Sequence, residues 1–209
     1  MEGQIDGSTQ RIYTPARVAI FIDGWNFKYA TFDAFGKEVD FVKLLNHFTG
    51  NDLLLRAYYY IGEWTPDAID HYLRVKNVDT PEKLRQDLEE QRKRTQSFLR
   101  FLSRNGYMVV KKPLKVFAGG TIKADLDLEL AIDMLTLADR CDRMILVSGD
   151  GDFVPLVERV AAKGVRVHVV STQQQEAYTR AQYRAADDLV DVADEFTELA
   201  DILPLIARN

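Results

Sequence analysis

The sequence has few of the features that mark exported or membrane proteins. It holds one cysteine, Cys141, which excludes an internal disulfide framework and suits a reducing compartment. No apolar run approaches the ~20 residues that a membrane-spanning helix needs. Residues Met1 to Arg11 are polar and contain no apolar signal-peptide core. We therefore expect a cytoplasmic protein that has no membrane partner.

Several motifs of phosphate and metal chemistry are also missing. No GxGxxG follows the first apolar run and no GxxxxGK[ST] occurs, which excludes a dinucleotide fingerprint and a P-loop. A calcium loop that opened at Asp150 would place Pro155 at the glycine position and Ala161 at the final glutamate, so that reading fails. An aspartyl-phosphate enzyme would need a second aspartate two residues after Asp23, where Trp25 stands. The three histidines share no metal-ligand spacing.

An excess of basic residues is missing as well, because 27 Lys and Arg face 32 Asp and Glu, for a net charge of −5. This balance argues against non-specific coating of nucleic acid, although it leaves room for a nucleic-acid enzyme whose acidic residues gather in a metal site. Hydrophobic residues make up 46% and charged residues 28% of the 209 positions, an ordinary globular composition. We expect one domain over residues 1–209, with a core at about 17–190.

Apolar runs that alternate with helical periodicity predict an α/β fold with a mainly parallel sheet. Gly62–Asp79 is expected to be an irregular connection, and the tail to Asn209 a short strand and a helical end. The predicted strands are Arg17–Ile22, Leu53–Ile61, Tyr107–Val110, Leu114–Phe117, Met144–Val147 and Val165–Val170. The predicted helices are Phe41–Phe48, Thr80–Asn105, Ala124–Arg140, Phe153–Lys163 and Thr172–Ala186.

The longest helical signal, residues 80–105, has clear boundaries. Thr80 can cap it, Pro81 takes the first helical position, and Gly106 ends it. We expect this helix to stand outside the core of the domain, as a flap or a partner surface. A solvated helix with i,i+4 charge pairs is an equal alternative. Its basic centre is Arg92, Lys93 and Arg94.

Two predicted strands end in aspartates. Asp23 follows the first strand, and Asp150 and Asp152 follow the strand that ends at Val147. Open parallel sheets bind their ligands beyond the carboxyl ends of the strands, so these carboxylates are candidate ligands. The competing interpretation for each is a simple helix cap. It is strongest for Asp152, which directly precedes the helix predicted from Phe153.

A third acid, Asp127, heads the apolar stripe of the predicted helix 124–140. A carboxylate on a face that packs against a sheet is expensive unless it meets a cation, a hydrogen-bond network or solvent. The alternative is that Asp127 accepts backbone N–H bonds in the first helical turn. The rest of the stripe is Leu130, Ala131, Met134, Leu135 and Ala138.

If Asp23, Asp127 and Asp150 converge, their charges need a counter-ion. Two carboxylates ~4 Å apart repel by about 4 kcal/mol at an effective dielectric of 20. A divalent cation removes that penalty, and carboxylate oxygens with open water positions suit Mg²⁺ or Mn²⁺. Such an ion polarises a phosphodiester and generates hydroxide from bound water.

Three segments resemble the NYN domain family, in particular its LabA-like branch within the PIN-like nuclease superfamily. The segments are VAIFIDGWN at Val18–Asn26, KADLDLELAIDML at Lys123–Leu135 and ILVSGDGDF at Ile145–Phe153, and the pattern continues to Val170. The resemblance implies a PIN-like, Rossmannoid three-layer sandwich and metal-dependent ribonuclease activity. The implied partner is RNA, single-stranded or structured, and a homodimer is left open.

The resemblance also implies roles for individual residues. In the helix motif, Ala124 replaces the usual glycine and an extra acid follows, so Asp125 stays an alternative to Asp127. Asn26 and Ser148 fall on polar positions of the family that support the ligands or the phosphate. The acidic positions, implied to be both catalytic and metal-binding, are Asp23, Asp127, Asp150 and Asp152.

These observations leave two main hypotheses, a metal-dependent endoribonuclease and a non-catalytic RNA-binding or regulatory module with the same acidic pocket. Hydrolysis of a small phosphoester is a third. Lys123, together with Lys111, Lys112 and Lys115, is placed to follow an RNA backbone, although a solvated strand edge explains these lysines equally well. Aromatic residues near the first acid are candidates for base stacking or for the core: Trp25, Phe27 and Tyr29.

Overall fold

A sheet of six parallel strands forms the centre of the molecule, in the order β3-β2-β1-β6-β7-β8. The structure is a computed structural model that describes residues 14–77, 80–174 and 184–208. This sheet confirms the predicted α/β class. The strands are β1 (Arg17–Asp23), β2 (Leu53–Glu63), β3 (Tyr107–Pro113), β6 (Arg143–Val147), β7 (Arg166–Ser171) and β8 (Glu195–Glu198).

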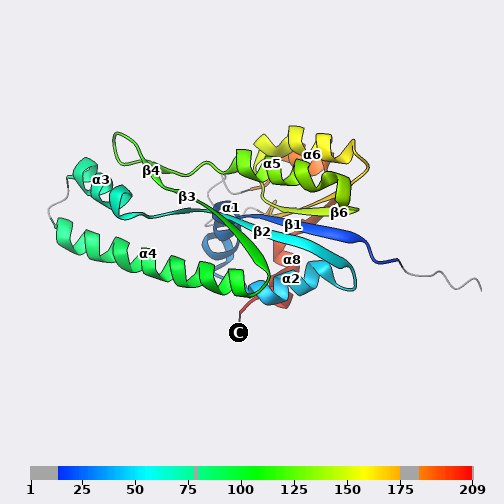
Figure 1. Ribbon diagram of the computed structural model, residues 1–209, viewed down its shortest axis with the longest axis horizontal. Helices are drawn as coiled ribbons and strands as arrows, with labels where there is room; N and C mark the ends of the chain where they lie inside the picture. Colours follow the sequence, from blue (N-terminus) through cyan, green and yellow to red (C-terminus); the bar gives the residue numbers. More distant parts are fainter. Residues whose placement is uncertain (1–13, 78–79, 175–183, 209) are drawn as a thin grey trace, which may run out of the picture.

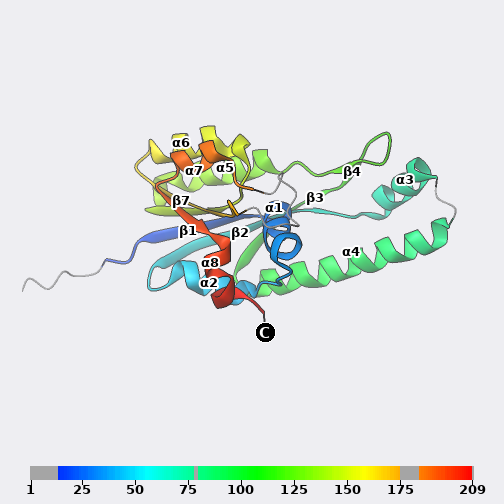
Figure 2. The same ribbon diagram turned by 180° about the vertical axis from the view of Figure 1, so that it is seen from behind.

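Helices cover both faces of the sheet and complete the predicted three layers (Figures 1 and 2). One face carries α5 (Asp127–Leu137), α6 (Val154–Ala161) and α7 (Asp187–Val192), with the short turns η2 (Ala138–Arg140) and η3 (Gly151–Phe153). The other face carries α1 (Gly24–Lys28), the π-helix η1 (Tyr29–Asp33), α2 (Phe41–Thr49) and α8 (Leu199–Ile206). No described helix is long and apolar enough to cross a bilayer.

The unbroken apolar run of β1 explains why it lies in the middle. Successive side chains of a strand point to opposite faces. Val18, Ile20 and Ile22 therefore enter the core on one face of the sheet. Ala19 and Phe21 enter the core on the other. A strand that is buried on both sides is typical of a parallel sheet covered by helices.

A smaller region projects beyond the sheet, and we call it the extension. It consists of α3 (Pro66–Lys76), the first half of α4 (Pro81–Arg104) and an antiparallel pair, β4 (Lys115–Val116) with β5 (Ile122–Lys123). Figures 1 and 2 show these elements together at one end of the molecule. They share a core of their own, made of Trp64, Ala68, Ile69, Leu73, Leu88 and Leu114.

Helix α4 joins the two regions. Leu99 and Leu102, near its end, are buried in the core under the sheet, whereas Leu88 is buried in the extension. The expectation that this helix would stand outside the core is therefore wrong for its second half. A predicted i,i+4 charge pair does occur on its surface, between Arg94 and Glu90 at 3.5 Å.

The stretch 62–79, expected to be irregular, is largely regular. Strand β2 continues to Glu63, and α3 follows from Pro66 to Lys76. The Thr65 hydroxyl accepts a hydrogen bond from the N–H of Ala68 at 3.2 Å, which caps α3. The expectation is wrong because proline after a capping threonine is itself a helix start.

Two other predicted helices differ from the structure. The helix expected from Ala124 begins at Asp127, because residues 124–126 form an irregular connection after β5. Of the helix predicted over 172–186, residues 172–174 and 184–186 are not helical, and residues 175–183 lie outside the described residues. Helix α7 was not predicted.

Candidate functional site

The order of the strands defines where a ligand should bind. Strands β2 and β3 lie on one side of β1, and β6, β7 and β8 lie on its other side. Chain connections diverge at this switch point between β1 and β6, which leaves a crevice at the carboxyl ends of the two strands. Asp23 is the last residue of β1, and Ser148 directly follows β6. The strand-end acids thus lie where an open α/β sheet binds its ligand.

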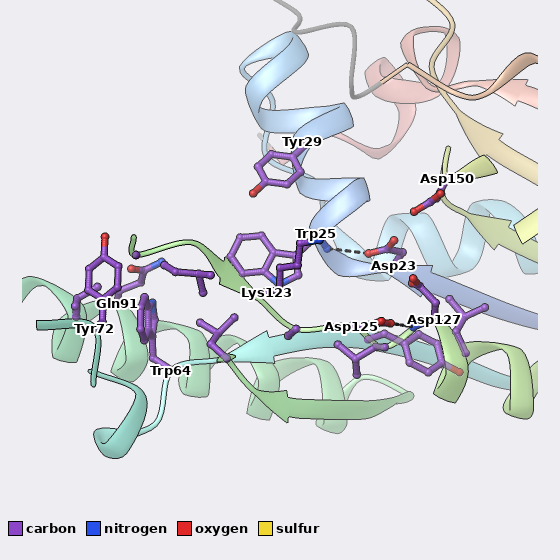
Figure 3. Close-up of a pocket in the computed structure, with 18 of the residues that line it drawn as sticks. Asp23, Trp25, Tyr29, Trp64, Tyr72, Gln91, Lys123, Asp125, Asp127 and Asp150 are labelled. Atoms are coloured by element: carbon purple, nitrogen blue, oxygen red, sulfur yellow. Dashed lines mark hydrogen bonds between the residues drawn. The ribbon is translucent and has the colours of Figure 1, made fainter. Parts of the chain in front are cut away.

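A pocket of about 820 Å³ opens at this point. Figure 3 shows carboxylates gathered at one end of it. The structure brings all four predicted acids to this pocket and adds the alternative acid of the helix motif. The aspartates that line it are Asp23, Asp125, Asp127, Asp150 and Asp152.

Asp23 combines the two interpretations that the sequence left open. Its Oδ1 accepts hydrogen bonds from the N–H groups of Trp25 and Asn26, both at 3.2 Å, and so caps α1. Its Oδ2 accepts a longer bond of 3.4 Å from the hydroxyl of Ser148. Burial raises the pKa of Asp23, these backbone bonds oppose the rise, and the charge of Asp150 adds to it. Capping therefore uses one oxygen and leaves the other for the pocket.

At the second strand end, the helix cap lies two residues earlier than expected. Asp150 Oδ1 accepts the N–H of Asp152 at 2.9 Å and caps η3. Asp152, predicted to be the simple cap, lies inside that first turn instead and is exposed. The assignment fails because the 3-10 turn begins at Gly151, ahead of the predicted start at Phe153.

Asp127 opens α5, and its carboxylate accepts no hydrogen bond from any described residue. Leu126 occupies the N-cap position, and Asp125 Oδ1 accepts the N–H of Asp127 at 3.3 Å just ahead of the helix. Burial first, and then the negative charges nearby, raise the pKa of Asp127 to about 6. The charges that contribute are those of Asp125, Asp23, Asp150 and Asp152. The structure therefore shows no capping by Asp127.

Asn26 and Ser148 tie the two strand ends together. Asn26 Oδ1 accepts the N–H of Gly149 at 2.9 Å, which links the start of α1 to the turn after β6. Ser148 is buried, and its hydroxyl accepts the N–H of Asp150 at 3.2 Å. Neither side chain lines the pocket. Their observed contacts position the acids.

The lysines of the sequence hypothesis divide into two kinds. Lys111 pairs with Glu63 at 2.8 Å, and Lys112 pairs with Glu129 at 2.6 Å, so both charges are already matched within the molecule. Lys123 lines the pocket and lies directly across the β4–β5 ladder from Lys115. Like charges that face each other across a ladder are unfavourable, so this pair suits an anion.

Sequence reasoning missed the far wall of the pocket. Figure 3 shows Trp64, Tyr72 and Gln91 at the end away from the acids, with Trp25 between the two groups. Trp64 follows β2, and the other two side chains come from α3 and α4. The missed signal is the Thr65-Pro start of α3 together with the apolar i,i+4 spacing of Ile69 and Leu73.

The carboxylates that line the pocket determine whether a divalent metal would fit there. Carboxylate oxygens are the ligands that Mg²⁺ and Mn²⁺ prefer. Among the described residues, however, no group of three or more His, Cys, Asp or Glu side chains is arranged closely enough to hold an ion. The expected common point of Asp23, Asp127 and Asp150 is therefore not found. The donor set still fits Mg²⁺, which usually keeps several waters and takes one or two carboxylates directly.

The fold and pocket together define a class: a parallel α/β protein with an acidic pocket at the switch point of its sheet. Comparison with known proteins identifies a family within this class. The NYN domain model matches residues 17–200, and the chain belongs to this family, which includes nucleases. The resemblance that the sequence motifs indicated is confirmed.

Two individual proteins are similar to this chain. The low amplitude and bright protein LabA of Synechococcus elongatus is 33% identical over 205 residues, which cover 94% of this chain and 91% of the relative. A crystal structure of a protein of unknown function from Vibrio parahaemolyticus has a TM-score of 0.66 at 24% identity and covers 93% of this chain and 97% of its own. The second likeness supports the fold alone.

Proposed function

We propose that this protein is a metal-dependent endoribonuclease that hydrolyses RNA phosphodiesters at a Mg²⁺ or Mn²⁺ site held by aspartates. The observation that carries the proposal is the set of five aspartates lining one pocket at the switch point. Membership of a family that includes nucleases supports it. The proposal also accounts for the cost of keeping acids together, because a divalent cation offsets their mutual repulsion.

Each acid has a distinct part in this proposal. Asp23 and Asp150, at neighbouring strand ends, would hold the metal directly, and each has one oxygen outside its capping bonds. Asp127 and Asp152 would hold it through bound water. When bound, the ion supplies Lewis acidity toward the phosphodiester and lowers the pKa of its water.

The residues around the acids would orient the substrate. Asn26 and Ser148 fix the two strand ends against each other through the bonds to Gly149 and Asp23. Lys123, on the pocket wall, would neutralise a phosphate next to the one that is cut. Trp25 offers a flat side chain between the acidic end and the rest of the pocket.

The proposal is tested by incubating labelled single-stranded and structured RNA with the protein in Mn²⁺, Mg²⁺ or EDTA. We expect internal cleavage with metal and none in EDTA. Asp150→Asn should lower the rate by about 10²-fold or more, a typical loss when one preorganised charge is removed from such a site. Asp139→Asn is the matched control, because Asp139 pairs with Lys163 outside the pocket. Equal rates for both variants would refute the assignment.

A second candidate is a non-catalytic RNA-binding or regulatory module. The absence of a ready group of three ligands among the described residues favours it. In that case the protein would bind RNA without cutting it, with or without Mn²⁺. Including p-nitrophenyl phosphate in the same assay separates a third activity, the hydrolysis of small phosphoesters, because only that activity would release nitrophenol.

A further inference from the structure

A second pocket adjoins the first and has the opposite character. Its volume is about 700 Å³, and it lies between α1 with η1 on one side and α4 on the other. The two pockets share part of their lining, so they adjoin along a common wall that contains the Trp25 indole, and we call the two together the groove. The shared residues are Trp25, Trp64, Gln91 and Leu114.

Charge separates the two halves of this groove. Aspartates dominate the first pocket, where Lys123 is the single cation among the described lining residues. In the part of the chain that the structure describes, the second pocket has Glu38 as its single acid and is lined by four cations: Lys28, Lys37, Arg94 and Arg208. In a chain with a net charge of −5, such a gathering of positive charge is local and pronounced.

These cations remain available to a ligand. The Arg94 side chain is 83% exposed, and its pair with Glu90 is long, at 3.5 Å. Arg208 is 72% exposed and lies 3.5 Å from Glu38. Exposed ion pairs of this kind contribute little and exchange easily with solvent or with another anion.

Aromatic side chains accompany the cations. Phe32, on the π-helix η1, is 49% exposed and lines the second pocket. Trp25 lies in the shared wall, and the ammonium group of Lys28 lies over its ring at 5.6 Å from the centroid. A large aromatic left in solvent beside positive charges is typical of surfaces that stack the bases of single-stranded nucleic acid. π-Helical turns also occur frequently at functional sites.

We propose that the second pocket binds the nucleotides of a single-stranded RNA that flank the phosphate held at the aspartates. The identity of that phosphate rests on the proposed function. Phosphates would meet Lys28 and Arg94, and bases would stack on Phe32. Bases can reach these rings only when they are unpaired, because a duplex stacks its bases against one another. The preference is therefore for single strands.

The test measures binding apart from cleavage. Fluorescence anisotropy of a labelled single-stranded oligoribonucleotide is recorded in EDTA over a range of salt concentrations. We expect Lys28→Gln with Arg94→Gln to weaken binding about tenfold at low salt and to reduce the slope of log K against log salt by about 1.4, or 0.7 for each lost phosphate contact. Phe32→Ala should weaken binding about fivefold or more.

The matched control removes the same charge from outside both pockets. Lys83→Gln with Lys93→Gln changes two exposed lysines of α4 that line neither pocket, and affinity should stay within twofold of the parent. An equal loss in the control overturns the inference. So does a blunt duplex that competes as well as the single strand. Displacement of RNA by polyglutamate at equal charge would assign the pocket to an acidic peptide and also overturn it.

The two proposals can fail separately. If Mn²⁺ produces no cleavage while Lys28→Gln with Arg94→Gln still weakens single-strand binding, the nuclease proposal falls and the RNA-binding groove stands. If cleavage occurs while those variants bind as tightly as the parent, the nuclease proposal stands and the groove assignment falls.

Discussion

The sheet and the extension hold the two walls of the acidic pocket by different means. The sheet is enclosed by two clusters of nineteen buried residues each, whereas the extension has a cluster of six. Regions with few buried apolar contacts open locally at lower free energy than the rest of a protein. The comparison teaches that the acids stand on the rigid wall, and that the aromatic wall is the one able to adjust to a ligand.

The largest effect should come from truncating a side chain of the sheet core. Leu146→Ala removes a side chain that is fully buried in β6 and should lower the free energy of unfolding by about 2–5 kcal/mol. Leu88→Ala in the extension should cost less globally, because its loss is limited by the local stability of that region. Urea denaturation followed by circular dichroism gives both values. Equal losses would remove the distinction between the two regions.

Hydrogen exchange sharpens the same comparison. In Leu88→Ala, the amides of α3 should exchange faster while those of β6 stay protected, since the extension can open without the sheet. If α3 and β6 lose protection together, the extension does not open independently.

A smaller effect is expected at Gly62, where the sheet meets the extension. A Cβ at Gly62 would lie 2.4 Å from the Cβ of Ala124 and 2.7 Å from Leu114 Cδ2, so neighbouring side chains already occupy the space that a methyl group would need. Gly62→Ala should cost about 1–3 kcal/mol through overpacking. Thermal denaturation measures the loss, and tryptophan fluorescence reports the displacement of Trp25, whose Nε1 is 3.2 Å from the same position. A variant with the same melting temperature as the parent would show that the packing around Gly62 accommodates the added methyl group.

The sheet was predictable because buried parallel strands have a simple signature. The run at 17–22 became β1 with one residue added, and the run at 165–170 became β7 shifted by one. Such strands meet helices on both faces, so their apolar runs are unbroken and need no partner to be recognised. Helix α3 has a weaker signal, since only one side of it packs, on a small core.

The acidic part of the candidate site was predictable from the sequence, and its far wall was not. Asp23 and Asp150 each follow a strand, and the parallel topology alone brings such residues to one edge. The far wall could not be inferred, because Trp64, Tyr72 and Gln91 come together only through the packing of α3 on α4. The periodicity of one segment shows which of its faces is buried, but it does not show which other segment packs there.

Removing one acid should change stability by less than truncating the core. In EDTA, Asp127→Asn should melt no lower than the parent, because it relieves repulsion from the neighbouring carboxylates. Asp127→Ala should behave alike, since Asp127 makes no capping bond to a described residue. Mn²⁺ should raise the melting temperature of the parent more than that of either variant. A full metal shift in Asp127→Asn would exclude this residue from metal binding.

The smallest effect is expected at the edge of the sheet away from the pocket. Arg17 holds Asp142 through bonds of 3.0 and 2.7 Å, which lower the pKa of Asp142 to about 2. Because this pKa is lower in the folded protein, the pair stabilises above the ordinary pKa of the carboxyl group, and its contribution is lost as the pH falls from about 4 toward 2.

The measurement is the difference in melting temperature between the parent and Asp142→Asn. It should be small at pH 6 and should shrink further as the pH falls through about 2. A difference that grows on acidification would contradict the assignment.

Helix α4 fixes the number of residues that can stand between its contacts with the extension and its contacts with the sheet. Its residues serve the extension at Leu88, the groove at Gln91 and Arg94, and the sheet core at Leu99. Each residue advances an α-helix by about 100°, so one residue inserted between Leu88 and Leu99 would turn one end away from its core. The rotational positions of its two ends are therefore fixed relative to each other. Insertions that a loop would tolerate should therefore be excluded from this segment.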